Sequence, residues 1–197
     1  MSHNPEQIRS FIAIELPQNV QHGLGQLRSE LERAEHPFVK WVNTENIHVT
    51  LKFLGNIPFK QVEEIAKAIE EASKRIPPFH LEISGLGAFP NINRPRVIWV
   101  GIRGEMNNLQ KLQQNIDSAL APFGFAKEER PFIPHLTLAR IKEGASSAER
   151  KSIGELLISA RFEISYYIGV ETISLMRSQL TPEGAIYTCQ FLARLKA

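Results

Sequence analysis

Runs of apolar residues divide the chain into short strands that are separated by polar turns. Alternation of apolar and polar residues with a period of two is typical of a half-buried strand, and a short apolar run bounded by Pro or Gly is typical of a buried one. The sequence therefore predicts strands at 10–16, 38–42, 48–55, 79–84, 97–102, from residue 135 onward, and at 160–168, 171–179 and 186–195. Residues 181–184 read Thr-Pro-Glu-Gly, so we expect a hairpin turn between the last two strands.

Apolar residues spaced three and four apart predict helices between these strands. The predicted helices are 17–34, one that begins near Pro58 and ends before Pro77, 106–120 and 149–158. In the first of them Val20, Leu24, Leu27 and Leu31 form one apolar face, although two glycines in the same segment lower its helix propensity.

The order of these elements indicates a duplication. Strand-helix-strand-strand-helix-strand occurs once up to about residue 85, and a similar order with an extra terminal strand follows from residue 97. We predict an α+β fold in which residues 1–197 form a single bilobal domain built from pseudo-repeat halves at about 8–90 and 95–197. Two antiparallel sheets would carry helices outside and a groove between them. The pattern leaves open whether the halves form separate lobes or exchange strands.

One short sequence occurs in both halves. His-x-Thr-Leu is found at 48–51 and again at 135–138, each time at the start of a predicted strand. Side chains alternate between the two faces of a strand, so His48 and Thr50 should point to one face. The apolar residues between them, and Phe53, should point to the other face. The second copy is expected to behave in the same way.

These residue types suit metal-free phosphodiester chemistry. Histidine titrates near neutral pH, so His48 and His135 could hold opposite protonation states, one donating a proton while the other accepts one. The hydroxyls of Thr50 and Thr137 could donate hydrogen bonds to phosphate oxygens and stabilise charge in the transition state. A zinc site is the competing interpretation, but it requires three or four ligands, and no carboxylate or cysteine accompanies either motif on its exposed face. We therefore expect neither metal nor cofactor.

The composition of the chain indicates what kind of ligand it binds and in which cellular compartment we expect it. With 43% hydrophobic and 22% charged residues the chain resembles an ordinary globular protein, and its net charge of +2 favours a small anion or a nucleic-acid end over long nucleic acid. The single cysteine, Cys189, excludes an internal disulfide and a cysteine-based zinc site. No leader or membrane-spanning run is evident, so we expect a soluble, cytoplasmic protein without membrane contact, and nothing requires an oligomer.

Beyond the paired motifs, the sequence closely resembles the RNA 2′,3′-cyclic phosphodiesterases, also called 2′-5′ RNA ligases, of the two-histidine phosphoesterase superfamily. The resemblance covers nearly the whole chain. The segments that carry it are 9–13 (RSFIA), 41–42 (WV), 48–55 (HVTLKFLG), 95–99 (PRVIW), 132–140 (FIPHLTLAR) and 178–180 (SQL), with Gly184 and Tyr187.

The resemblance implies hydrolysis of terminal 2′,3′-cyclic phosphates to 2′-phosphomonoesters, and a reverse activity that joins ends through a 2′-5′ linkage. RNA 3′ ends, such as tRNA fragments, or small cyclic nucleotides would be the substrates. By the same analogy His48 donates a proton to the leaving 3′ oxygen and His135 accepts one from water. The residues alone do not decide this order, because the two predicted strands look alike.

Five further residues are candidates for substrate binding: Arg9, Lys52, Phe132, Arg140 and Tyr187. Lys52 shares the face of His48 if its strand is regular. Arg140 has the opposite parity from His135, so it reaches the site only if the strand ends or bulges before it. Arg9 could contact phosphate or ribose. The aromatic residues that could either pack in the core or stack on a base are Trp41, Trp99, Phe132 and Tyr187.

Two alternatives remain open at this stage. The same pair of histidines could act on another substrate, such as a 2′-5′ oligonucleotide or a nucleotide-sugar cyclic phosphate. A protein that binds RNA ends without turnover would also use the threonines, although binding alone does not require two matched histidines.

Overall fold

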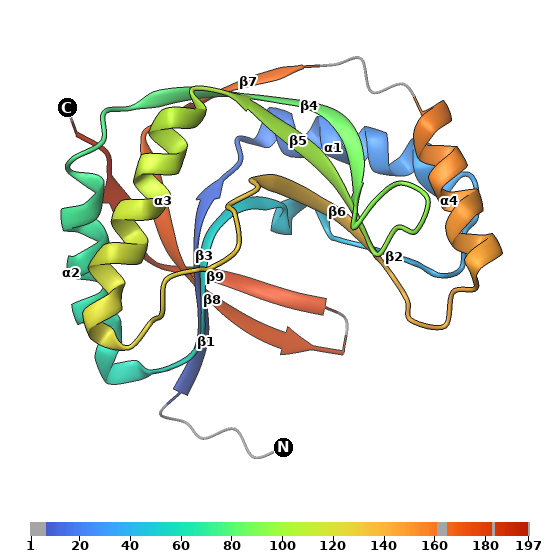
Figure 1. Ribbon diagram of the computed structural model, residues 1–197. Coiled ribbons are helices and arrows are strands. Elements are labelled where there is room, and N and C mark those ends of the chain that lie inside the picture. The colour runs from blue at the N-terminus through green and yellow to red at the C-terminus, as the bar shows by residue number, and fades with distance from the viewer. Residues whose placement is uncertain (1–6, 161–164, 183, 197) are drawn as a thin grey trace.

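Two antiparallel sheets and four α-helices make up the computed structural model, which describes residues 7–160, 165–182 and 184–196 (Figure 1). Sheet A contains β3 (His48–Pro58), β1 (Gln7–Glu15), β8 (Thr172–Thr181) and β9 (Gly184–Arg194), in that order. Sheet B contains β2 (Val39–Trp41), β6 (His135–Ile141), β5 (Val97–Gly104), β4 (Phe79–Phe89) and β7 (Tyr166–Val170). The predicted α+β class is confirmed.

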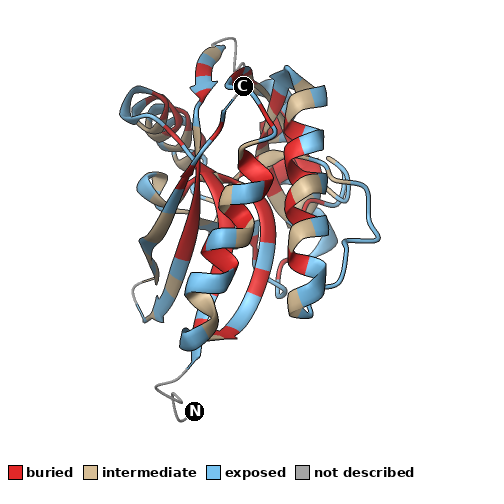
Figure 2. Cartoon of the chain, turned by 90° about the vertical axis from the view of Figure 1, so that its left-hand side faces the viewer, coloured by how far each residue is buried: buried red, intermediate tan, exposed pale blue. Residues whose placement is uncertain are grey.

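The helices cover the outer faces of the two sheets. They are α1 (Gln18–Glu32), α2 (Val62–Ser73), α3 (Met106–Leu120) and α4 (Ser147–Ser159). Helices α2 and α3 pack on sheet A, whereas α1 and α4 lie against sheet B (Figure 1). Buried residues gather where helices face strands, and the outward helix surfaces are exposed (Figure 2). None of the helices within the described ranges is long and apolar enough to cross a membrane.

Each sheet takes strands from both parts of the chain. Sheet A joins β1 and β3 to β8 and β9, and sheet B joins β2 and β4 to β5, β6 and β7. The two predicted halves therefore exchange strands. Because one continuous apolar cluster runs through both sheets and all four helices, neither half has a core of its own.

Some predicted elements differ in extent. Pro58 ends β3, and a short 3-10 helix at Phe59–Gln61 leads into α2, so this helix begins later than predicted. Strand β4 continues five residues beyond the predicted 79–84 because it pairs with β5 as far as Phe89. Of the strand predicted at 160–168, residues 161–164 lie outside the described residues, and β7 begins only at Tyr166.

Gly23 in α1 allows a close helix–strand contact. A Cβ atom at this position would lie 1.8 Å from the hydroxyl oxygen of Tyr166 in β7. The glycine lowers helix propensity, as the sequence indicates, but it lets the tyrosine ring pack directly against the helix backbone.

Candidate active site

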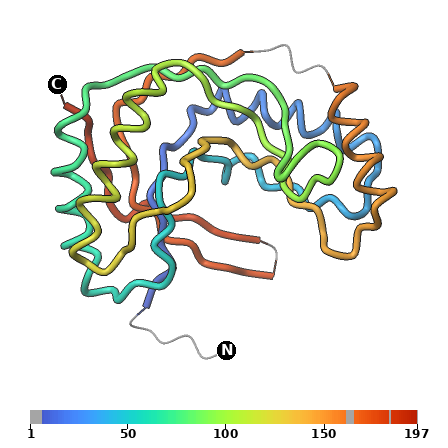
Figure 3. Tube along the Cα trace, viewed as in Figure 1, coloured from blue at the N-terminus to red at the C-terminus, as the bar shows by residue number. Residues whose placement is uncertain are grey.

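The two motif strands meet where the sheets adjoin. Strand β3 is an edge strand of sheet A, and the first half of β6 has an unpaired edge because β2 pairs only with Ala139–Ile141. Strands β3 and β6 contact each other, and the tube in Figure 3 shows them together at the centre of the molecule. We call the sheet surface that carries His48, Thr50, His135 and Thr137 the motif face.

Both histidines are held by the same local contact. Nδ1 of His48 lies 2.8 Å from the backbone carbonyl oxygen of Asn46, and Nδ1 of His135 lies 2.8 Å from that of Ile133. A carbonyl oxygen only accepts hydrogen bonds, so Nδ1 carries the hydrogen in each ring. Both imidazoles therefore keep Nε2 as the nitrogen available to a substrate, and each can either donate or accept a proton there.

A β-bulge in β3 changes which residues reach the motif face. Thr50 pairs with Ala13 but Lys52 pairs with Ile12, so the register shifts by one residue between them. After the bulge Lys52 turns into the protein, and Phe53 turns out to the motif face, where the residue is 68% exposed. The prediction that Phe53 points away from His48 is wrong, because a bulge reverses the alternation that a regular strand would have.

The same bulge removes Lys52 from the site. Its Nζ atom lies 2.5 Å from Oδ1 of Asp117 in α3 and donates to the carbonyl oxygen of Ala126 at 2.9 Å. The two charged side chains are only 8% and 9% exposed. Lys52 therefore joins β3 to α3 and to the loop that leads to β6. The prediction that Lys52 contacts phosphate is therefore wrong.

The matching bulge in β6 brings Arg140 to the motif face. Thr137 pairs with Trp99 but Ala139 pairs with Ile98, so Leu138 is the extra residue. Ala139 is buried and Arg140 is exposed, on the same side as Thr137. The sequence predicts Arg140 at the site only if its strand ends or bulges before this residue, and this bulge meets that condition.

Arg9 and Arg140 approach the same tyrosine from opposite sheets. Arg9 in β1 pairs with Ser178, which pairs in turn with Tyr187 in β9, so the three residues form one row on the motif face of sheet A. Burial raises the pKa of the Tyr187 hydroxyl, and the positive charges of Arg140 and Arg9 oppose this rise. Positive charge from both sheets therefore acts on one hydroxyl beside His48.

His48 is enclosed by aromatic rings and one carboxylate. Its ring stacks on Phe11 at 4.6 Å between centroids and meets the edge of Tyr187 at 5.5 Å. Burial lowers the pKa of His48, which the hydrogen bond to Asn46 and the nearby Glu15 carboxylate partly oppose. Glu15 lies opposite His48 in the ladder between β1 and β3. Burial among these rings therefore favours the neutral form of the imidazole.

His135 has a comparable but smaller aromatic environment. Phe89 in β4 meets its ring edge-on at 4.9 Å between centroids, and Phe89 also contacts the indole of Trp99 at 5.3 Å. The indole lies over Gly87, where a Cβ atom would stand 2.2 Å from its ring carbons. A glycine at this point of β4 allows Trp99 to lie flat on the sheet next to the motif.

Comparison with known proteins places this geometry in a family. The LigT like phosphoesterase family matches the chain twice in succession, over residues 14–99 and 100–187. The chain belongs to the LigT-like phosphoesterase family. The protein named RNA 2′,3′-cyclic phosphodiesterase in Aquifex aeolicus is 40% identical over 150 residues, covering 76% of this chain and 78% of the relative. The protein of the same name in Methanothermobacter thermautotrophicus is 32% identical, covering 96% of this chain and 100% of the relative.

Solved structures of similar proteins agree with this assignment. A crystal structure of a Thermus thermophilus protein matches with a TM-score of 0.77 at 25% identity, covering 96% of this chain and 99% of the other. E. coli LigT complexed with 3′-AMP matches with a TM-score of 0.72 at 26% identity, covering 98% and 100% of the two chains. The fold of this LigT-like phosphoesterase is therefore that of its family.

Two of the other aromatic candidates pack against the apolar core of the phosphoesterase. Phe132 is partly buried against the main apolar cluster and lines a shallow pocket together with Gln113 and Asp117 of α3. It therefore lies on the α3 side of the loop before β6. Trp41 also packs against the main cluster.

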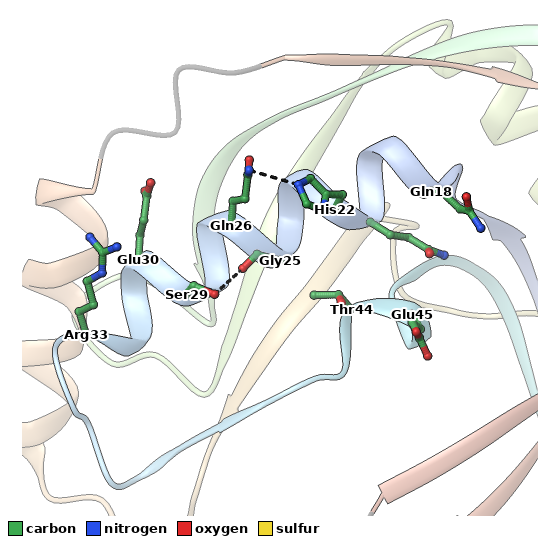
Figure 4. Close-up of a pocket in the computed structure, with 10 residues that line it drawn as sticks. Gln18, His22, Gly25, Gln26, Ser29, Glu30, Arg33, Thr44 and Glu45 are labelled. Atoms are coloured by element: carbon green, nitrogen blue, oxygen red, sulfur yellow. Dashed lines mark hydrogen bonds between the residues drawn. The ribbon is translucent and has the colours of Figure 1, made fainter.

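Two cavities differ in their relation to the motif face. A cavity of about 200 Å³ lies beside His48 and is lined in part by Glu15, Glu45 and Tyr187. A wider polar pocket of about 820 Å³ lies along the exposed side of α1 (Figure 4). Its lining residues come from α1 and the neighbouring 3-10 helix Thr44–Asn46, and none belongs to either motif.

Sequence reasoning did not identify several residues of the motif face. Phe11 and Glu15 follow Arg9 at even spacing along β1, so the alternation of that strand could have indicated them. Phe53 occupies the same place in its motif as Arg140 does in the other, and alignment of the two copies could have paired them. No group of three or more His, Cys, Asp or Glu side chains within the described part of the chain is arranged to hold a metal ion.

Proposed function

We propose that this LigT-like phosphoesterase hydrolyses 2′,3′-cyclic phosphate ends of RNA to 2′-phosphomonoesters. The observation that carries the proposal is the matched pair of imidazoles, each fixed through Nδ1 with Nε2 free, on two strands that meet at the junction of the sheets. Relatives named RNA 2′,3′-cyclic phosphodiesterase support the choice of substrate.

In the proposed mechanism His135 accepts a proton from water through Nε2 as the water oxygen attacks phosphorus. The bond from phosphorus to the 3′ oxygen breaks, and protonated His48 donates its Nε2 proton to that oxygen. Thr50 and Thr137 donate hydrogen bonds to the two non-bridging oxygens. The same steps, with a 5′ hydroxyl in place of water as the nucleophile, would join two ends through a 2′-5′ linkage and free the 3′ hydroxyl.

As proton donor His48 must be protonated, although its burial favours the neutral form. A bound phosphodiester carries a negative charge, and an anion next to the ring would raise the pKa of His48 again. Substrate binding would therefore supply the protonated donor. Arg9 would contact the cyclic phosphate, and Arg140 would bind the substrate farther along β6. Exposed Phe53 would offer a surface on which a base can stack.

The proposal extends to the cellular setting. The whole chain would act as one bilobal domain and as a monomer in the cytoplasm. RNA 3′ ends such as tRNA fragments, or small cyclic nucleotides, would be its ligands. Neither metal nor cofactor takes part in the proposed mechanism.

The test is hydrolysis of an oligoribonucleotide that ends in a 2′,3′-cyclic phosphate, measured with EDTA present and with 2′- and 3′-phosphate products resolved. His48→Ala and His135→Ala should each lower kcat by at least about a hundredfold, because each removes one proton-transfer group. His22→Ala, on the exposed side of α1, is the matched control and should retain full activity. Full activity in either motif variant would refute the two-histidine mechanism, and a 3′-phosphate product would refute the direction of ring opening.

A further inference from the structure

Lys40 extends the positive charge of the motif face toward the edge of sheet B. It lies in β2 directly opposite Arg140 of β6 in the antiparallel ladder. Residues opposite each other in a ladder share one face, so Lys40 lies on the face of Arg140 and Thr137. Both cations are exposed, whereas the neighbours of Lys40 in β2, Val39 and Trp41, pack against the core.

The two positive charges face each other across the ladder. Like charges directly opposite each other across a ladder repel and destabilise the pair. Among the described residues, neither Lys40 nor Arg140 takes part in an ion pair. The sequences of β2, β5 and β6 also contain no Asp or Glu. An anionic ligand on this surface would relieve the repulsion.

We infer that Lys40 and Arg140 together form a subsite for the phosphodiester on the 5′ side of the terminal nucleotide. The inference rests on the proposed function, in which the cyclic phosphate lies at Thr50 and Thr137. Arg140 is three residues beyond Thr137, one of them a bulge, so the two positions are about 7–10 Å apart along the strand. Neighbouring phosphates of an extended nucleotide chain have a comparable separation.

The subsite would let the protein discriminate between an RNA end and a cyclic mononucleotide. A mononucleotide has no phosphodiester on its 5′ side, so it can occupy the histidine pair but not the Lys40–Arg140 subsite. An oligoribonucleotide occupies both. The protein should therefore bind the end of a strand more tightly than the corresponding mononucleotide, and Lys40 should contribute only to the first.

The test compares Lys40→Gln with Lys111→Gln, which removes the same charge from an exposed position of α3. Fluorescence anisotropy measures binding of a labelled oligoribonucleotide that ends in a 2′-phosphate, and competition measures binding of a nucleoside 2′-phosphate. Lys40→Gln should weaken oligonucleotide binding about three- to tenfold at low salt and reduce the slope of log K against log salt by about 0.7. Lys40→Gln should leave mononucleotide binding unchanged. Lys111→Gln should change neither oligonucleotide binding nor mononucleotide binding.

Three results would overturn the inference. The first is equal weakening by Lys40→Gln and Lys111→Gln, which would indicate a general effect of net charge. The second is a loss of affinity in Lys40→Gln that is the same for mononucleotide and oligonucleotide. The third is no loss of affinity in Lys40→Gln. Because binding needs no turnover, failure of the inference can be told apart from failure of the proposed function, which hydrolysis of a cyclic mononucleotide by the wild-type protein tests separately.

Discussion

The buried pair of Lys52 and Asp117 offers a quantitative test of how β3 is joined to α3. Replacing Lys52 by Met keeps most of the side-chain volume but leaves the carboxylate of Asp117 buried without its cation. Loss of one partner from a buried ion pair typically costs about 3–5 kcal/mol. Asp117 keeps a hydrogen bond from Gln113 at 2.8 Å and a longer one from the backbone N–H of Glu128 at 3.4 Å. We therefore expect a loss near the lower end of that range, about 3 kcal/mol.

Urea unfolding at neutral pH, followed by circular dichroism, measures this loss. A loss of about 3 kcal/mol corresponds to a fall in Tm of about 6–12 °C for a chain of this length. The double variant Lys52→Met with Asp117→Leu removes both charges, so it should unfold within about 1 kcal/mol of the wild type or be more stable. A double-mutant cycle, made from the wild type, the two single variants and the double variant, should give a coupling free energy of about 3 kcal/mol or more.

The reasoning would be refuted by either of two results. One is a loss below about 1 kcal/mol in Lys52→Met, which would mean that water or another group compensates Asp117. The other is a double variant whose loss equals the sum of the two single losses, which would mean that the charges do not interact.

Three smaller changes test other features of the structure. Gly87→Ala should destabilise the protein by about 1–3 kcal/mol and alter tryptophan fluorescence, because its Cβ would displace Trp99; unchanged unfolding would contradict that packing. Gly23→Ala should destabilise the wild type but become neutral or stabilising by up to about 1 kcal/mol in a Tyr166→Ala background, where only the gain in helix propensity remains; loss of stability in both backgrounds would contradict the contact. Because burial lowers the pKa of His48 in the folded protein, the unfolded chain binds that proton first as the pH falls. The wild type should therefore lose stability relative to His48→Gln below about pH 6.5 but not above it, and a difference that is constant with pH would contradict the shift.

Local sequence determined the elements and the chemistry of the site. Apolar spacing predicts α3 at its observed bounds of Met106–Leu120. The repeated His-x-Thr places each imidazole and hydroxyl on one face of a strand, because adjacent side chains alternate over so short a segment. These features depend on a few neighbouring residues, which is why the sequence alone indicates them.

Tertiary structure decided how the strands combine and what lies beyond each motif. The exchange of strands between sheets depends on pairing between distant segments, which leaves no periodic signal. Likewise, a bulge depends on the register of the partner strand, and one in each motif strand sends Lys52 inward and brings Phe53 and Arg140 to the motif face. Alternation read along a strand assumes a constant period of two. It therefore fails at the residue where the partner strand changes register, and in this protein that residue follows directly after each motif.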